Sequence, residues 1–258
     1  MLSGIVEMAK RALLYRRPTE PDTLAIKHGS QIFAVRLRRH RRATRYTLRI
    51  HPSDREAILT LPPVGTIVDA KDFAQRHGAW IAARLGRLPK AAPFEPGTIV
   101  PLRGVAHRIV HRAGERGTVW TETRDSGEHI ICVAGEAAHI DRRVHDYLKR
   151  EARSDLQKAS LRYAAMLGVK VTRLSIRDQS SRWGSCTAGG SLSFSWRLIL
   201  APPYVLDYLA AHEVAHLVEM NHSAKFWKVV GRICSATERA KTWLDTSGND
   251  LHRYGIQE

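Results

Sequence analysis

A histidine–glutamate pattern near residue 212 has the residue types and spacing of a metal site. His212-Glu213-Val214-Ala215-His216 separates two imidazoles by four residues, so on an α-helix they project from the same side, one turn apart. Two such imidazoles can bind one divalent metal ion, and the neighbouring carboxylate can act as a general base. This pattern specifies only three positions in a chain with 13 histidines, so the surrounding sequence has to support it.

The segment that begins at Pro202-Pro203 predicts a largely buried helix around both histidines. Proline is tolerated in a first helical turn. The helix would carry a broad apolar surface made by Val205, Leu206, Leu209, Ala210, Val214, Leu217 and Val218. A buried glutamate is rare unless it is paired or coordinated, so Glu213 beside a prospective ligand favours a metal site over two histidines satisfied by neighbours.

His222 is the predicted third metal ligand. A tetrahedral site needs a donor from outside the helix, so the chain must break soon after His216. Asn221 can provide that break because asparagine tolerates the left-handed conformation that ends helices. Two carboxylates are alternatives: Glu219, which comes round to nearly the same helical face, and Glu238 on the following helical segment.

Three protein ligands leave a position for water, which predicts a metal-dependent hydrolase. The metal lowers the pKa of that water towards neutrality, so Glu213 can accept a proton while a polarised carbonyl is attacked. Glu213 can then pass the proton to the leaving amine. Charge that develops in the transition state needs a further donor. Candidates by proximity in the sequence are Arg182, Arg197 and Tyr204.

The C-terminal half predicts the elements that would position this site. Apolar residues recur at helical spacing from Asp141 to Leu167, and Gly168 is well placed to end that helix. Residues 169–176 and 192–200 predict strands. Ser223 can cap a helix that follows the break.

The N-terminal half alternates short β-favouring runs with one helical segment. The runs span 31–38, 46–50, 57–61, 99–110, 118–123 and 129–133. The first three predict an antiparallel meander, and the periodicity of residues 68–88 predicts a helix after it. Prolines between Leu88 and Gly97 indicate a linker. No internal repeat is evident.

The net charge of +16 favours a polyanionic neighbour such as nucleic acid, anionic lipid or an acidic substrate. The arginines that could contact phosphates are Arg36, Arg38, Arg39, Arg41, Arg42 and Arg45. A solvated hairpin that discourages edge pairing is the alternative. Tyr46 is the one aromatic residue within this cluster, so a complete stacking platform for single strands is not evident.

Three well-separated cysteines, Cys132, Cys186 and Cys234, form no C-x-x-C pair, which argues against a disulfide framework or a cysteine zinc site. Reduced thiols predict a cytoplasmic protein. No apolar run approaches the roughly 18 residues of a membrane span. Three regions are predicted. They are a tail or short amphipathic helix at 1–22, a β-rich region at 23–136 with one helix at about 68–88, and a catalytic part at 137–258.

Several motifs resemble the YgjP-like metallopeptidases, a family grouped with the SprT-like and related zincins. They are DQSSRWGSC at 178–186, WRLI at 196–199, HEVAH at 212–216 and NHSAKFW at 221–227. The resemblance is strong over about 140–235 and weaker around 36–61 and Trp80. It implies that His212, His216 and His222 bind Zn²⁺ and that Glu213 is catalytic.

The resemblance implies an α+β fold in which a zincin-like catalytic part follows a β-rich N-terminal part. By analogy with zincins, a peptide substrate would lie along an edge strand at Ser191–Leu198. Zinc-dependent hydrolysis of peptide bonds in a polypeptide is the leading function. The alternatives are a metal-dependent nucleotide pyrophosphatase or phosphohydrolase, and a nucleic-acid-associated protease or binding module with a basic N-terminal surface.

Overall fold

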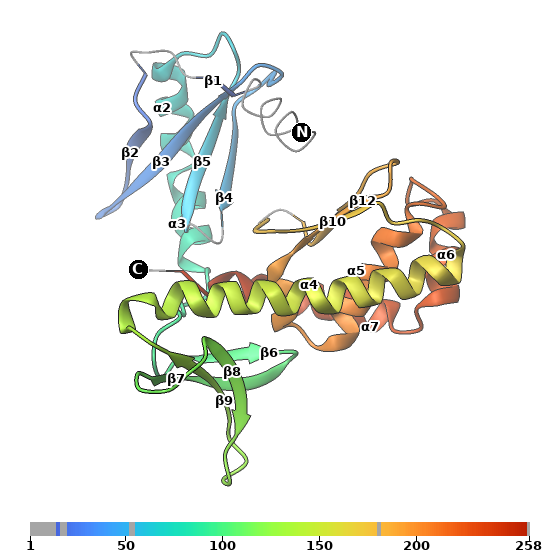
Figure 1. The fold of residues 1–258 in the computed structure, drawn as a ribbon. Coiled ribbons are helices and arrows are strands. Elements are labelled where there is room, and N and C mark those ends of the chain that lie inside the picture. Colours follow the sequence, from blue (N-terminus) through green and yellow to red (C-terminus); the bar gives the residue numbers. More distant parts are fainter. Residues whose placement is uncertain (1–13, 16–19, 52–54, 180–181, 257–258) are drawn as a thin grey trace. The chain divides into compact units, whose positions relative to one another are not determined.

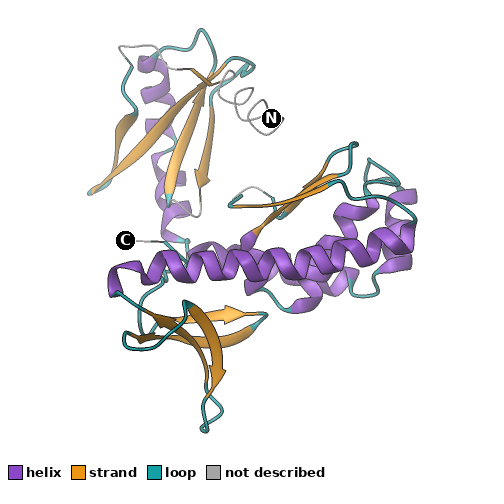
Figure 2. Ribbon diagram, in the orientation of Figure 1, coloured by secondary structure: helices purple, strands orange, loops and turns teal. Residues whose placement is uncertain are grey.

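Residues 1–89 and 90–258 form two separate units in the computed structural model (Figures 1 and 2). The structure describes residues 14–15, 20–51, 55–179 and 182–256, so most of the tail predicted at 1–22 lies outside the described residues. Sheets and helices are mixed, which confirms the predicted α+β class. The boundary predicted at 136–137 lies inside the second unit, and a separate domain at 137–258 remains a prediction.

A five-stranded sheet forms one side of the first unit. Its strands are β1 (Leu14–Tyr15), β2 (Thr23–His28), β3 (Gln31–His40), β4 (Thr47–His51) and β5 (Glu56–Leu61). β5 lies between β3 and β4 and runs parallel to β3, so the predicted antiparallel meander is wrong. Side chains of β5 are buried on both faces of the sheet, at Ala57, Ile58 and Leu59, which suits a central strand.

Two helices cover this sheet where one was predicted. Helix α2 (Ile67–Arg76) begins at Thr66, whose Oγ1 accepts from the N–H of Asp69 at 3.0 Å, and helix α3 (Gly78–Gly86) follows directly. The break falls at His77, and the next residue, Gly78, lies against β2, where a β-carbon on it would lie 3.2 Å from that of His28. Both helices contribute to the core of this unit, through Ala70, Ala74 and Ile81.

The second unit begins with a sheet that repeats the topology of the first. Its strands are β6 (Ile99–Leu102), β7 (Val105–Arg112), β8 (Val119–Thr123) and β9 (His129–Ala134). The order β6-β7-β9-β8 and its pairing senses match those of β2-β3-β5-β4, and each set precedes a helix. The structure therefore contains a topological repeat that the sequence did not reveal.

Helix α4 (Ile140–Leu167) runs along the second unit and contacts both this sheet and helix α5 (Pro203–Ala215) (Figure 1). Gly168 ends α4 with φ 66°, as predicted. The remaining strands are β10 (Arg173–Arg177), β11 (Gly184–Cys186) and β12 (Ser191–Ser195), and the remaining α-helices are α6 (Ala224–Ile233) and α7 (Thr237–Ser247). No helix among the described residues is long and apolar enough to span a membrane.

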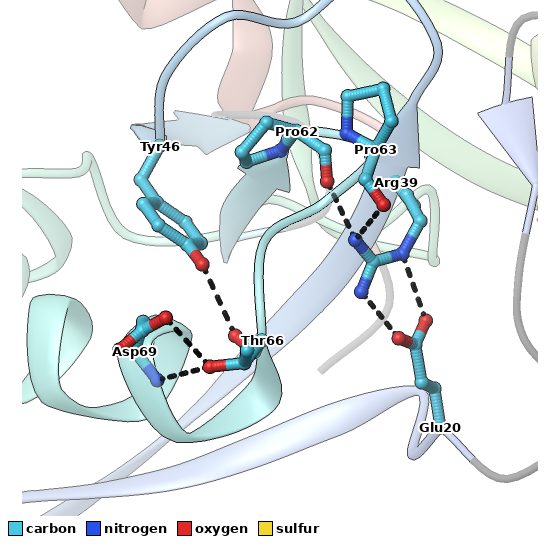
Figure 3. Close-up of polar contacts among 7 residues, drawn as sticks. All are labelled: Glu20, Arg39, Tyr46, Pro62, Pro63, Thr66 and Asp69. Atoms are coloured by element: carbon cyan, nitrogen blue, oxygen red, sulfur yellow. Dashed lines mark hydrogen bonds and ion pairs between the residues drawn. The ribbon is translucent and has the colours of Figure 1, made fainter.

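Arg39 is a buried structural residue of the first unit (Figure 3). Its guanidinium donates to both carboxylate oxygens of Glu20 and, through Nη1, to the carbonyl oxygens of Pro62 at 2.6 Å and Pro63 at 3.2 Å. Arg39 thus joins β3 to the loop after β5. Because it is 3% exposed, Arg39 is not part of a phosphate-binding surface, contrary to the prediction.

Replacement of Arg39 by alanine is expected to lower the free energy of unfolding of the first unit by about 3–5 kcal/mol, because Glu20 would stay buried without its partner. Hydrogen exchange of the β3 and β5 amides measures the change. Arg42→Ala, an exposed position in the turn that follows β3, is the control and should stay within about 0.5 kcal/mol of the parent. Equal protection in both variants would contradict this account.

Candidate metal centre

Helix α5 positions the first two histidines, with His212 in its last turn and His216 at its C-cap, immediately after Ala215. Pro203 occupies its first turn, as predicted, and the helix is buried on most sides. Asp207 fastens it to α4, where Arg162 and the Tyr163 hydroxyl both donate to the Asp207 carboxylate. His212 and His216 therefore project from a helix that packing holds in place, with ring centroids 5.1 Å apart.

The chain reverses immediately after α5 and brings His222 back to these two histidines. The last α-helical residue is Ala215, and turn hydrogen bonds continue to the N–H of Glu219, so the helix ends before the predicted break at Asn221. Ser223 caps α6 as predicted, its Oγ accepting from the N–H of Phe226 at 3.3 Å. His222 lies between the two helices, where its side chain can point back towards α5.

The three imidazoles are arranged as a metal-ligand set. Each offers one nitrogen, and these nitrogens lie within 4.8 Å of one another. The Nε2 atoms of His212 and His222 are 3.0 Å apart. A tetrahedral ion with metal–nitrogen bonds of about 2.0–2.1 Å separates its ligand atoms by roughly 3.3 Å, so the donor type and spacing fit a first-row divalent cation.

Contacts outside this set orient the histidine rings. Nδ1 of His216 donates to the carbonyl oxygen of Glu219 at 3.2 Å, which leaves its Nε2 as an acceptor. Nδ1 of His212 shares a hydrogen bond of 3.3 Å with the Tyr208 hydroxyl. Phe226, which is fully buried, stacks on the His216 ring at 4.5 Å. Neither Tyr208 nor Phe226 was predicted from the sequence.

Glu213 points to the opposite wall, which is the short strand β11. The residue is 5% exposed. A β-carbon on Gly184 would lie 2.5 Å from Glu213 Oε1, so the carboxylate packs directly against the backbone of β11. Glycine at 184 is therefore required for this position of Glu213, a role visible only once the strand and the helix are placed together.

Burial controls the charges of this site. It raises the pKa of the Glu213 carboxyl to about 7, although the positive charge of Arg182 opposes the shift. Burial and the two neighbouring imidazoles lower the pKa of His212 to about 4, and burial also lowers that of His216. Both imidazoles are thus neutral near pH 7, which is the form that binds metal ions.

A cavity of about 570 Å³ opens over the histidines and Glu213. Of the three residues proposed to stabilise the transition state, Arg182 lines this cavity. Arg197 is buried elsewhere, where its Nη1 donates to the carbonyl of Tyr254 at 2.7 Å. Tyr204 lies beneath the guanidinium of Arg239 and is not among the residues that line the cavity. The structure thus retains Arg182 alone of these candidates.

The alternative carboxylate ligands lie outside the histidine set. The Glu219 side chain accepts from the N–H of Asn221 at 3.5 Å, and Glu238 pairs with Lys241 at 3.1 Å. Among the described residues, the only group of three or more prospective metal ligands is His212, His216 and His222.

The expected substrate strand requires a correction. β12 (Ser191–Ser195) is the central strand of its sheet, flanked by β10 and β11, so it has no open edge for a peptide. The chain leaves the strand at Ser195, where its Oγ accepts from the N–H of Arg197 and a 3-10 turn begins. The edge strand beside α5 is β11 (Gly184–Cys186).

Most of the chain matches one protein family. The family model described as "YgjP-like, metallopeptidase domain" matches residues 44–247. This chain belongs to the YgjP-like metallopeptidase family. Membership makes it a metal-dependent hydrolase that acts on polypeptides, and it confirms the family suggested by the sequence motifs.

Part of the chain is similar to a solved structure. The crystal structure of the metallopeptidase zymogen of Pyrococcus abyssi abylysin is similar over 39% of this chain and 99% of that chain, with 22% identity and a TM-score of 0.33. No curated protein matches the chain.

Gly184→Ala is expected to displace the Glu213 carboxylate and to abolish most peptidase activity while metal content stays unchanged, because the new β-carbon reaches Glu213 and not the histidines. Peptidase assays paired with metal analysis measure both effects. Gly189→Ala, on the same β-hairpin with its nearest neighbour at 4.0 Å, is the control. Full activity of Gly184→Ala would show that the position of Glu213 is irrelevant.

Proposed function

We propose that this chain is a zinc-dependent metallopeptidase in which His212, His216 and His222 hold Zn²⁺ and Glu213 is the general base. The observation that carries the proposal is the convergence of three imidazole nitrogens beside one buried carboxylate. An all-imidazole donor set suits zinc better than the harder cations calcium or magnesium, which prefer oxygen ligands. Cytoplasmic location is also proposed, on the support of three free thiols.

When bound, zinc would supply Lewis-acid polarisation of a carbonyl oxygen and acidification of water. The three histidines would hold it through neutral imidazole nitrogens, two of them oriented by Tyr208 and by the Glu219 carbonyl.

Glu213 would move the proton in this reaction. Its carboxylate, held between α5 and β11, would accept a proton from water at Oε1 or Oε2 and later release it to the amine of the leaving peptide. Arg182 lines the same cavity and is our candidate for binding the carbonyl oxygen as negative charge develops. The buried walls around Glu213 would limit access of bulk water.

The two hydrolytic reactions considered from the sequence are not equally supported. The family match favours cleavage of the peptide bond over that of the phosphoanhydride. Peptide hydrolysis also gives the buried carboxylate of Glu213 a second role, because the leaving amine has to be protonated. Release of pyrophosphate produces no amine and does not need this step.

Glu213→Gln is expected to reduce cleavage of a labelled unfolded protein by at least about 100-fold, because the amide cannot take up a proton. Zinc content should remain that of the parent, since the histidines are untouched. Glu219→Gln, a nearby acid outside the histidine set, is the control and should retain activity. A Glu213→Gln protein with the parental rate would rule out Glu213 as the base.

A further inference from the structure

The first unit contains a second cavity, of about 550 Å³, whose walls are mainly aromatic. Its lining includes Arg45, Tyr46, Leu48, Phe73, His77 and Trp80. No carboxylate lines it. The histidines and Glu213 lie entirely in the other unit, so this cavity is not part of the peptidase site.

Secondary structure brings these aromatic rings together from distant positions in the sequence. Phe73, His77 and Trp80 recur at helical spacing along α2 and α3, while Tyr46 immediately precedes β4. The ring of Phe73 stacks on that of Tyr46 at 5.8 Å and on that of His77 at 4.3 Å. Trp80 is 37% exposed. The stacking platform that the sequence did not reveal is therefore assembled by the fold.

Tyr46 is held in place before any ligand arrives (Figure 3). Its hydroxyl donates to the carbonyl oxygen of Thr66 at 3.2 Å. A β-carbon on Gly65 would lie 2.5 Å from the same hydroxyl, so the ring packs closely against that turn. A preorganised ring loses little conformational freedom on binding, which favours its use as a recognition surface.

Two exposed arginines lie in or next to this cavity. Arg45 lines it, and Arg49 lies on the adjacent strand β4, one residue beyond Leu48 of the lining. Both arginines are exposed, and no carboxylate within the described part of the chain pairs with either. Residues 1–89 contain 17 Lys and Arg against 7 Asp and Glu, so the first unit is strongly cationic.

We propose that this aromatic cavity and its arginines bind single-stranded nucleic acid. A base of a single strand is unpaired and can stack on Tyr46 or Trp80, while the flanking phosphates lie against Arg45 and Arg49. A duplex does not offer its base faces in this way. The absence of a carboxylate from the lining and the cationic surroundings favour this polyanion over a peptide.

The test uses the full chain and a fluorescein-labelled 20-nucleotide oligothymidylate, with binding followed by anisotropy over a series of salt concentrations. Trp80→Ala should weaken binding by about 5- to 100-fold, the usual cost of losing one base–aromatic stack. Trp80→Phe keeps a ring and should recover most of the affinity. Circular dichroism and thermal melting check that both variants are folded.

Arg45→Ala combined with Arg49→Ala should weaken binding and reduce the slope of log affinity against log salt by about 1.4, because two phosphate contacts are lost. The matched control combines Arg124→Ala with Arg142→Ala, two exposed arginines of the other unit. It removes the same charge and should change the slope little.

Three results would overturn the proposal. They are no binding of the oligothymidylate, binding that Trp80→Ala leaves unchanged, or equal effects of the two double-arginine variants. Binding of an aromatic-rich peptide that depends on Trp80, with oligothymidylate affinity unaffected, would assign the cavity to polypeptides and equally reject nucleic acid. Peptidase activity is not a readout here, so the outcome is independent of the proposed zinc chemistry.

Discussion

Three imidazoles can meet at one point only if the chain that supplies two of them turns back on itself to supply the third. His212 and His216 project from one side of α5 and its C-cap. The third ligand of a tetrahedral site has to approach from outside this helix, so the helix itself cannot supply it. The chain reverses after Ala215, and Ser223 caps the next helix, α6. His222 therefore lies between the two helices, close to His212 and His216. Phe226, at the start of α6, packs against all three rings and holds the reversed chain against α5.

The rest of the second unit supports this convergence. Helix α4 anchors α5 through Asp207, and the small sheet places Gly184 of β11 against Glu213. The carboxylate therefore lies between a helix and a strand that are fixed by separate parts of the chain. Its burial accounts for a pKa of about 7, well above that of a carboxylate in water.

The parts of the site that follow local rules could be predicted from sequence. The four-residue spacing predicted that His212 and His216 lie on one side of a helix. The preferences of helix-capping residues predicted that Ser223 begins α6 and that Gly168 ends α4. What sequence could not provide were pairings between distant segments. Three features depend on contacts between distant segments, which produce no periodic pattern in the sequence. They are the parallel alignment of β3 with β5, the central position of β12 and the burial of Arg39 against Glu20. The same applies to Gly184, whose importance comes from a helix that lies later in the chain.

The central claim is that the three histidines bind one zinc ion. Metal analysis of the purified chain by mass spectrometry, after dialysis against a weak chelator, tests it most directly in His222→Ala compared with Glu219→Gln. The account predicts about one zinc per chain in the parent and in Glu219→Gln, and a loss of most of it in His222→Ala. Zinc retained in His222→Ala but lost in Glu219→Gln would contradict it and make Glu219 the third ligand.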